Sequence, residues 1–214
     1  LGVYRSGKSF LLNRCMGLHA PYHGGFGVGH GQDTFTRGIY ICAEWVESLG
    51  GTIVWFDTEG LFASEIARAA YGPKMFSLAL LFSSTVLLNS VKVLSDQFFS
   101  FFGEQQQVAR VLRHGLAAEG LPESDLLPKN LNVVWLLQQP ISFMGSSGSE
   151  LSGQLEKFLK SRNDETREGV RRDFRHHLYV VPTATNDVRQ WANLDRAPDD
   201  ELASDFKEAT WRWR

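Results

Sequence analysis

A glycine-rich loop that leads straight into a helix constrains this chain more than any other feature. Residues 2–9 fit the pattern G-x-x-x-x-G-K-S, and the apolar run Phe10 to Leu12 follows directly. Gly2 and Gly7 allow backbone angles that a side chain would oppose, so the loop can turn its N–H groups inward around an anion. The helix that follows adds the positive end of its dipole at the same place. The pattern therefore predicts a phosphate-binding loop.

The charged and hydroxyl residues of this loop suit a nucleotide and its metal ion. We expect Lys8 to contact the β- and γ-phosphates and Ser9 to give its hydroxyl to Mg²⁺. The residues expected to surround the nucleotide here are Gly2, Tyr4, Arg5, Ser6, Gly7, Lys8, Ser9 and Phe10. The alternative is a glycine-rich turn with an incidental lysine, because so short a pattern also occurs by chance.

Composition excludes several functional classes. The formal net charge is −2 over 214 residues, which gives no basic character for binding nucleic acid. Cys15 and Cys42 are the only cysteines, so the sequence offers no disulfide framework and fits a reducing compartment such as the cytoplasm. The apolar segment 76–91 is too short and too often interrupted by polar residues to cross a bilayer, and indicates a core helix followed by a buried strand.

Apolar runs alternate with amphipathic segments, which predicts an α/β fold: a P-loop-type, mainly parallel central sheet with helices on both faces. Further strands are expected at 39–43, 52–56, 131–137 and 178–181, and helices at 10–16, 97–116, 150–160 and 199–213. Gly50 and Gly51 predict a hairpin turn, and residues 145–149 predict a flexible linker. The charge-dense segment 161–175 is expected to be a solvated helical face, and His176–His177 a surface pair.

Two more polar motifs follow the loop in chain order. Thr34 and Thr36 close a glycine-rich segment just before a strand, which is where a nucleotide switch places a magnesium ligand. Asp57 ends the next apolar strand, and such an aspartate holds Mg²⁺ in P-loop nucleotide hydrolases. Ligands of open α/β sheets bind beyond the carboxyl ends of the strands. Taken alone, the threonine segment is better explained as a surface loop ending in a polar turn, and an Asp-containing turn after a strand is common. The order of the three motifs along the chain nevertheless favours one nucleotide site.

The three motifs together resemble those of one family. Residues 2–14 (GVYRSGKSFLLNR) closely resemble the phosphate loop of guanylate-binding proteins, large GTPases of the dynamin superfamily to which the atlastins are more distantly related. Residues 34–40 (TFTRGIY) resemble the switch I segment of that family, and residues 57–61 (DTEGL) its Asp-Thr-Glu-Gly motif. The segment 78–90 is also similar, and the likeness extends with gaps over nearly the whole chain.

The resemblance implies a function and roles for several residues. It implies Mg²⁺-dependent GTP binding and hydrolysis, with nucleotide-dependent homodimerisation through the G domain. Thr36 would be the switch I magnesium ligand beside Ser9 and Asp57, and Thr34 would position the attacking water. Arg5 would act as an internal arginine finger, because a guanidinium stabilises the charge that develops on the transferred phosphoryl group. Glu59 would organise switch II.

The resemblance also sets expectations for the whole protein. Residues 1–214 would be a large GTPase domain that lacks most of its first strand and the C-terminal helical region that follows it. We therefore expect this stretch alone to hold the loop poorly in binding geometry. The protein would be cytoplasmic, with membrane association arising only through regions outside this sequence.

The chain differs from the family at the positions that recognise the guanine base. Most GTPases use Asn/Thr-Lys-x-Asp, which this sequence lacks, and guanylate-binding proteins use Arg-Asp after a strand like Val134–Leu137. Gln138 and Gln139 occupy those two positions, and a neutral amide cannot match the paired acceptance of a carboxylate. Three outcomes stay open: Gln139 reads guanine weakly, base specificity is relaxed, or base reading is lost. The alternatives to a GTPase are accordingly a nucleotide-binding scaffold with weak or no turnover, or a P-loop NTPase of relaxed specificity.

Overall fold

The computed structural model describes most of the chain. The described residues are 1–2, 6–18, 25–29, 38–60, 71–120, 131–139, 147–161, 164–187, 194 and 196–211. Four residues with predicted roles lie outside them, namely Tyr4, Arg5, Thr34 and Thr36.

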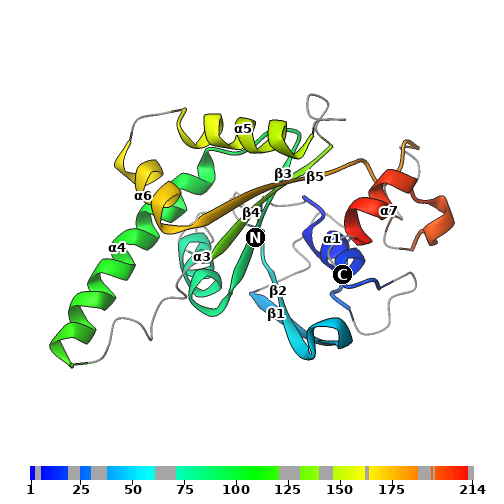
Figure 1. Cartoon of the computed structure of the whole chain (residues 1–214). Helices are drawn as coiled ribbons and strands as arrows, with labels where there is room; N and C mark the ends of the chain where they lie inside the picture. Colours follow the sequence, from blue (N-terminus) through cyan, green and yellow to red (C-terminus); the bar gives the residue numbers. More distant parts are fainter. Residues whose placement is uncertain are drawn as a thin grey trace.

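A parallel sheet forms the middle of the fold (Figure 1). Strand β4 (Asn132–Gln138) lies between β3 (Thr85–Val91) and β5 (Arg175–Val181), parallel to both. On the other side of β3, Gly2 forms a parallel bridge with Asn89, whose N–H donates to the Leu1 carbonyl at 2.8 Å. The apolar run of β4 is buried almost throughout, as expected for a strand covered on both faces.

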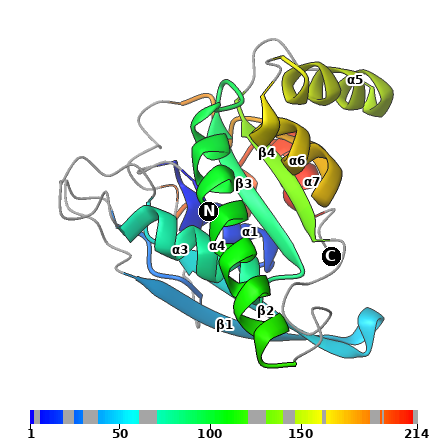
Figure 2. The same cartoon turned by 90° about the vertical axis from the view of Figure 1, so that its left-hand side faces the viewer.

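Helices cover both faces of this sheet (Figure 2). On one face lie α3 (Tyr71–Phe82), α4 (Gln97–Ala118), α5 (Gly148–Leu159) and α6 (Glu165–Asp173). On the other lie α1 (Lys8–Cys15), the short 3₁₀ helix η5 (Asp199–Glu201) and α7 (Ser204–Trp211). Successive side chains of β4 point to opposite faces of the sheet, so Trp135 packs against the first set of helices and Leu136 against the second. The predicted α/β fold is therefore confirmed.

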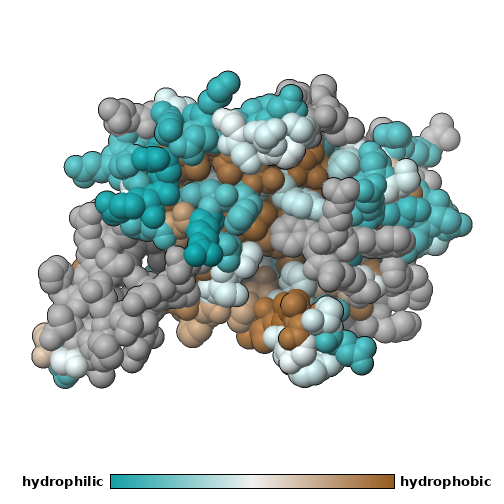
Figure 3. All heavy atoms as spheres, viewed as in Figure 1, coloured by the Kyte–Doolittle hydropathy of each residue, from teal (hydrophilic) through white to brown (hydrophobic). Residues whose placement is uncertain are grey.

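An antiparallel hairpin lies between α1 and α3 in the chain. Strands β1 (Ile39–Val46) and β2 (Gly51–Thr58) pair across the 3₁₀ turn η1 (Glu47–Leu49). Gly50 closes the turn at φ 56°, a left-handed conformation that favours glycine, so the predicted hairpin is confirmed. Hydrophobic residues gather over this hairpin in Figure 3. The exposed large apolar and aromatic side chains of its strands and turn are those of Tyr40, Ile41, Trp45, Leu49 and Val54. None of the described helices is long and apolar enough to span a membrane.

The predicted linker at 145–149 is wrong where the structure describes it. Helix α5 begins at Gly148, and Ser147 is its N-cap. The Ser147 N–H donates to the Glu150 carboxylate at 2.6 Å, while the Glu150 N–H donates to the Ser147 hydroxyl at 3.4 Å. This reciprocal pair is a capping box, so the serine and glycine residues start a helix instead of a flexible segment.

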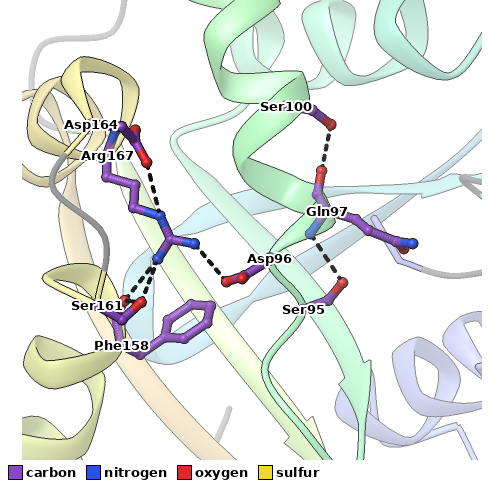
Figure 4. A network of polar contacts seen from close by, with 8 residues as sticks. All are labelled: Ser95, Asp96, Gln97, Ser100, Phe158, Ser161, Asp164 and Arg167. Atoms are coloured by element: carbon purple, nitrogen blue, oxygen red, sulfur yellow. Dashed lines mark hydrogen bonds and ion pairs between the residues drawn. The ribbon is translucent and has the colours of Figure 1, made fainter.

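The charge-dense segment 161–175 contains a buried cation, which the sequence analysis missed (Figure 4). Arg167 in α6 is only 3% exposed and donates to the Asp96 carboxylate at 2.6 Å and to the Phe158 carbonyl at 2.9 Å. Its guanidinium also lies 4.0 Å from the ring centroid of Phe99. One side chain therefore joins the start of α4, the end of α5 and α6.

Replacing Arg167 with methionine should destabilise the protein by about 2–4 kcal/mol. The variant retains an apolar stem but removes every donor, which leaves the Phe158 carbonyl and the acidic neighbours without that partner. Urea unfolding would measure the loss. The control is Arg172→Met in the same helix, whose side chain is 72% exposed and pairs with its neighbour Asp173. It should change stability by less than about 0.5 kcal/mol, and an equal loss in both variants would contradict the assigned role.

His176 is not the surface residue that the sequence analysis predicted, although His177 is exposed. Strand β5 begins before both, and Trp135 Nε1–H donates to His176 Nδ1 at 3.0 Å. Since Nδ1 accepts, Nε2 holds the proton of the neutral ring and donates to the Val170 carbonyl at 2.9 Å. Burial lowers the pKa of His176 below its usual 6.5. The neutral, half-buried ring therefore packs against Trp135 and Phe174 at the edge of the core.

The free energy of unfolding should fall as the pH drops below about 6.5, partly through His176. In the unfolded chain this histidine binds its proton near pH 6.5, whereas in the folded protein it does so only at lower pH. The stabilisation is thus complete above 6.5 and decreases until the pH reaches the folded pKa. Chemical unfolding from pH 7.5 to 5 would show this decrease, and His176→Gln should flatten it. His177→Gln is the control and should keep the wild-type profile; identical profiles in both variants would refute the role of His176.

Candidate functional site

Gly2 and Ser6, from the loop before α1, contact Asn89 of β3 and Gln138 at the carboxyl end of β4. A Cβ added to Gly2 would stand 2.7 Å from the carbonyl oxygen of Asn89 and 2.9 Å from its Cβ, so this position has room only for hydrogen. Gly7 adopts φ 70° and precedes the first turn of α1, whose first intrahelical bond runs from the Leu11 N–H to the Gly7 carbonyl at 2.9 Å. The two motif glycines are therefore required for different reasons. Gly2 lets the loop backbone approach β3 closely, and Gly7 adopts a left-handed backbone conformation.

The substitution Gly2→Ala should force the loop and β3 apart. Because the nearest atom is backbone oxygen, the clash cannot be relieved by a side-chain rotation. We expect about 2 kcal/mol or more of lost stability, measured by thermal unfolding. Gly153→Ala is the control, because that glycine lies in α5 with open space around its Cβ position. The control should keep or raise stability, by up to about 1 kcal/mol. A wild-type melting curve for Gly2→Ala would contradict the close-approach argument.

Ser9 and Asp57 come from segments far apart in the sequence and meet at the start of α1. The Ser9 hydroxyl donates to Asp57 Oδ2 at 2.6 Å, and Asp57 is 1% exposed at the end of β2. A hydroxyl and a carboxylate at this spacing fit Mg²⁺, which takes oxygen ligands and keeps several of its waters. Among the described residues no group of three or more His, Cys, Asp or Glu side chains forms a metal site. The donor set thus suits magnesium held by few protein ligands, with Thr36 outside the described residues.

Lys8 opens α1 beside two acidic groups. Burial lowers the pKa of its ammonium, and the carboxylates of Asp57 and Glu59 oppose that shift. The first N–H groups of a helix have no acceptor inside that helix, so they and Lys8 together favour an anion here. The Phe10 ring instead stacks on Phe206 of α7 with centroids 5.8 Å apart, so only its backbone is placed to serve the anion.

Glu59, just after β2, forms two hydrogen bonds with Gly38, the residue before β1. Its N–H donates to the Gly38 carbonyl at 2.9 Å, and its carboxylate accepts from the Gly38 N–H at 3.4 Å. Gly38 directly follows the segment that contains Thr34 and Thr36. This double contact joins the two segments that resemble switches; that Glu59 organises switch II stays a prediction.

The side chain of Gln138 is directed at the loop. Its amide donates to the Ser6 carbonyl at 2.8 Å and to Asn89 Oδ1 at 2.7 Å. Gln139 has a left-handed backbone with φ 53°, and its N–H donates to the Val181 carbonyl at 2.9 Å. Asn89 is a site residue that was not predicted, although an asparagine within the apolar strand VLLNSV is a signal that a buried polar group has a specific partner.

The described site therefore has a compact set of members. The structure brings together Gly2, Ser6, Gly7, Lys8, Ser9, Asp57, Glu59, Asn89 and Gln138. Gln139 follows at the end of β4. The arrangement presents one ammonium, backbone donors and a hydroxyl–carboxylate pair at the carboxyl ends of strands, which is what a metal-bound polyphosphate requires.

Comparison with known proteins gives consistent matches. Residues 1–124 match the family model described as guanylate-binding protein, N-terminal domain. Guanylate-binding protein 1 of Mus musculus is 36% identical over 227 residues, which cover 97% of this chain and 37% of that protein. Guanylate-binding protein 4 of Homo sapiens is 26% identical over 226 residues, covering 96% of this chain and 34% of that protein.

The matches concern one part of these relatives. The chain spans about a third of their length, from 34% to 37% in the two proteins just named. The family model covers the loop, both switch-like segments and β3, and it ends before the Gln138–Gln139 positions. Together with the fold and the arrangement of the loop, these matches show that the chain belongs to the guanylate-binding protein family.

Proposed function

We propose that this chain is the Mg²⁺-dependent GTP-binding and GTP-hydrolysing domain of a large GTPase. The observation that supports it most directly is the 2.6 Å contact between the loop hydroxyl of Ser9 and the strand-end carboxylate of Asp57. A P-loop nucleotide hydrolase needs these two groups within reach of one magnesium ion. The relatives bear the name guanylate-binding protein, which favours a guanine nucleotide.

The chemistry would be an in-line attack of water on the γ-phosphate. Lys8 and the amides at the start of α1 would bind the β- and γ-phosphates, and Ser9, Asp57 and Thr36 would hold the metal. When bound, Mg²⁺ neutralises part of the phosphate charge. Thr34 positions the water, and Arg5 stabilises the charge that develops on the transferred group. Catalysis in this scheme is mainly positioning and charge stabilisation.

Magnesium dependence can be tested through the Ser9–Asp57 pair. Phosphate release from GTP should require Mg²⁺, stop with excess EDTA and fall strongly in Asp57→Asn, which keeps the size of the side chain but removes its charge. Asp200→Asn, a substitution on η5 at the C-terminal end of the chain, is the matched control and should leave release unchanged. Release that is equal with and without the metal would reject the proposal.

A P-loop NTPase of relaxed base specificity is the second candidate. It is favoured by Gln138, whose amide donates to the loop carbonyl of Ser6 and to Asn89. Competition of unlabelled ATP against labelled GTP separates the two candidates. Displacement by GTP alone supports the GTPase, and equal displacement by both supports relaxed specificity.

Self-association and location belong to the same proposal. We expect the full-length protein to form a homodimer through this domain when GTP is bound, and to work in the cytoplasm. Sedimentation velocity with a non-hydrolysable GTP analogue and with GDP would test the first point. A dimer with the analogue and a monomer with GDP is the expected result, and a monomer in both conditions would reject it.

A further inference from the structure

We propose that Gln138 is a positioning residue which, together with Asn89, sets the orientation of the Ser6–Gly7 peptide in the phosphate loop. This proposal rests on the nucleotide site proposed above and assigns to Gln138 a task other than reading the base.

The contacts converge on one carbonyl group. Gln138 Nε2 donates to the Ser6 carbonyl at 2.8 Å, and Asn89 Nδ2 donates to the same oxygen at 2.9 Å. Asn89 Nδ2 also lies 2.9 Å from the Ser6 hydroxyl, and its Oδ1 accepts from Gln138 at 2.7 Å. Asn89 is 4% exposed and Ser6 is 6% exposed, so water competes little for these bonds. The two amides thus form a closed network beneath the loop.

The orientation of this carbonyl decides where the next amide points. A trans peptide is planar, so its C=O and N–H groups point in opposite directions. With the Ser6 oxygen drawn toward β3 and β4, the Gly7 N–H is directed away from these strands. Backbone N–H groups of such a loop bind the α- and β-phosphates. Fixing the Ser6 carbonyl therefore prepares a phosphate donor before the nucleotide arrives, which reduces the ordering cost of binding.

The arrangement uses chemistry that only an amide side chain supplies here. The Ser6 carbonyl and Asn89 Oδ1 are both acceptors, so the group between them has to donate twice. The NH₂ of glutamine provides two donors, whereas a carboxylate provides none. Gln138 ends β4 opposite Val91 of the neighbouring strand, which brings its side chain within reach of Asn89 two residues earlier.

Nucleotide affinities of Gln138→Met in the full-length protein test the proposal. Methionine has nearly the same length but cannot donate. The probes are GDP, IDP, which lacks the 2-amino group of guanine, and GMP, which lacks the β-phosphate. Dissociation constants for GDP and IDP should rise together by about fivefold to tenfold, because the hydrogen bond from Gln138 that orients the Ser6 carbonyl is lost, and that for GMP should rise less. Gln97→Met, at an exposed position that begins α4, is the control and should bind all three as the wild type does.

Base reading by Gln138 would give a different pattern. In that case the affinity for GMP would fall as much as that for GDP, and the affinity for IDP would be unchanged if the contact is to the 2-amino group. Equal losses for GMP and GDP overturn the proposal, as does unchanged affinity for GDP and IDP. A double-mutant cycle with Asn89→Leu adds a second criterion. Since both amides act on one carbonyl, the combined loss should differ from the product of the single losses, and strictly multiplicative losses would count against the shared network.

Failure of the proposed nucleotide site can be recognised separately. If the wild-type protein binds none of the three probes, the proposed function fails. Hydrogen–deuterium exchange then tests the hydrogen-bond network of Gln138, Asn89 and Ser6 without a nucleotide. The peptide that contains residues 6–10 should exchange faster in Gln138→Met than in Gln97→Met. Equal exchange rates would overturn the positioning role even without a nucleotide.

Discussion

Replacing Lys8 with alanine is expected to abolish measurable GTP binding. The Lys8 ammonium opens α1 near Asp57 and Glu59, and both carboxylates oppose the lowering of its pKa by burial. Without the ammonium, two acidic groups would face a polyphosphate that carries the same sign of charge. Charge-assisted hydrogen bonds contribute about 1.5–3 kcal/mol each, so the loss of contacts to two phosphates predicts at least about a hundredfold weaker binding.

The measurement is a titration with labelled GTP in the presence of Mg²⁺. Lys157→Ala is the matched control, since it removes the same charge from an exposed position on α5. The control should bind GTP as the wild type does, because the charge of an exposed side chain outside the site is screened by salt. Full GTP affinity in Lys8→Ala would remove the basis for the site.

Replacing Arg5 with alanine is expected to leave GTP binding nearly intact and to slow hydrolysis by about 10³ or more. The reason is that an arginine finger acts mainly where charge develops in the transition state, and contributes less to the bound ground state. Arg5 lies outside the described residues, so this expectation rests on its position in the loop sequence and on the family resemblance.

Single-turnover hydrolysis under saturating protein would separate chemistry from binding. Arg5→Lys retains the charge without the planar fork and should recover only part of the rate. If Arg5→Ala and the wild type release phosphate at the same rate while both bind GTP, the scaffold alternative would be favoured over the enzyme. Loss of binding instead of rate would assign Arg5 to nucleotide affinity.

Local patterns predicted most helices and strands correctly. The hairpin followed from Gly50, and the helix after the loop from an apolar run that ends at a glycine with φ 67°, Gly17. The predicted helix from 199 is split, because a 3₁₀ turn comes before α7, and helix ends depend on bonds that sequence patterns resolve poorly. The missed start of α5 depended on Ser147 and Glu150, whose capping box competes with the flexibility suggested by serine and glycine.

Sequence by itself predicted a phosphate loop, placed Asp57 at the end of a strand and predicted the α/β fold, because each depends on residue types at short, regular spacings. The family followed from the resemblance of the motifs to those of guanylate-binding proteins. Only the tertiary structure showed that Ser9 meets Asp57, that Arg167 is buried and His176 half-buried, and that the amide of Gln138 donates to the Ser6 carbonyl. These facts depend on which distant segments become neighbours: Gln138 and Ser6 are 132 residues apart and still form a 2.8 Å hydrogen bond. The composition and periodicity of the sequence are the same whether Gln138 faces a base, water or a backbone carbonyl. The packing of the strands determines which of these three the side chain contacts.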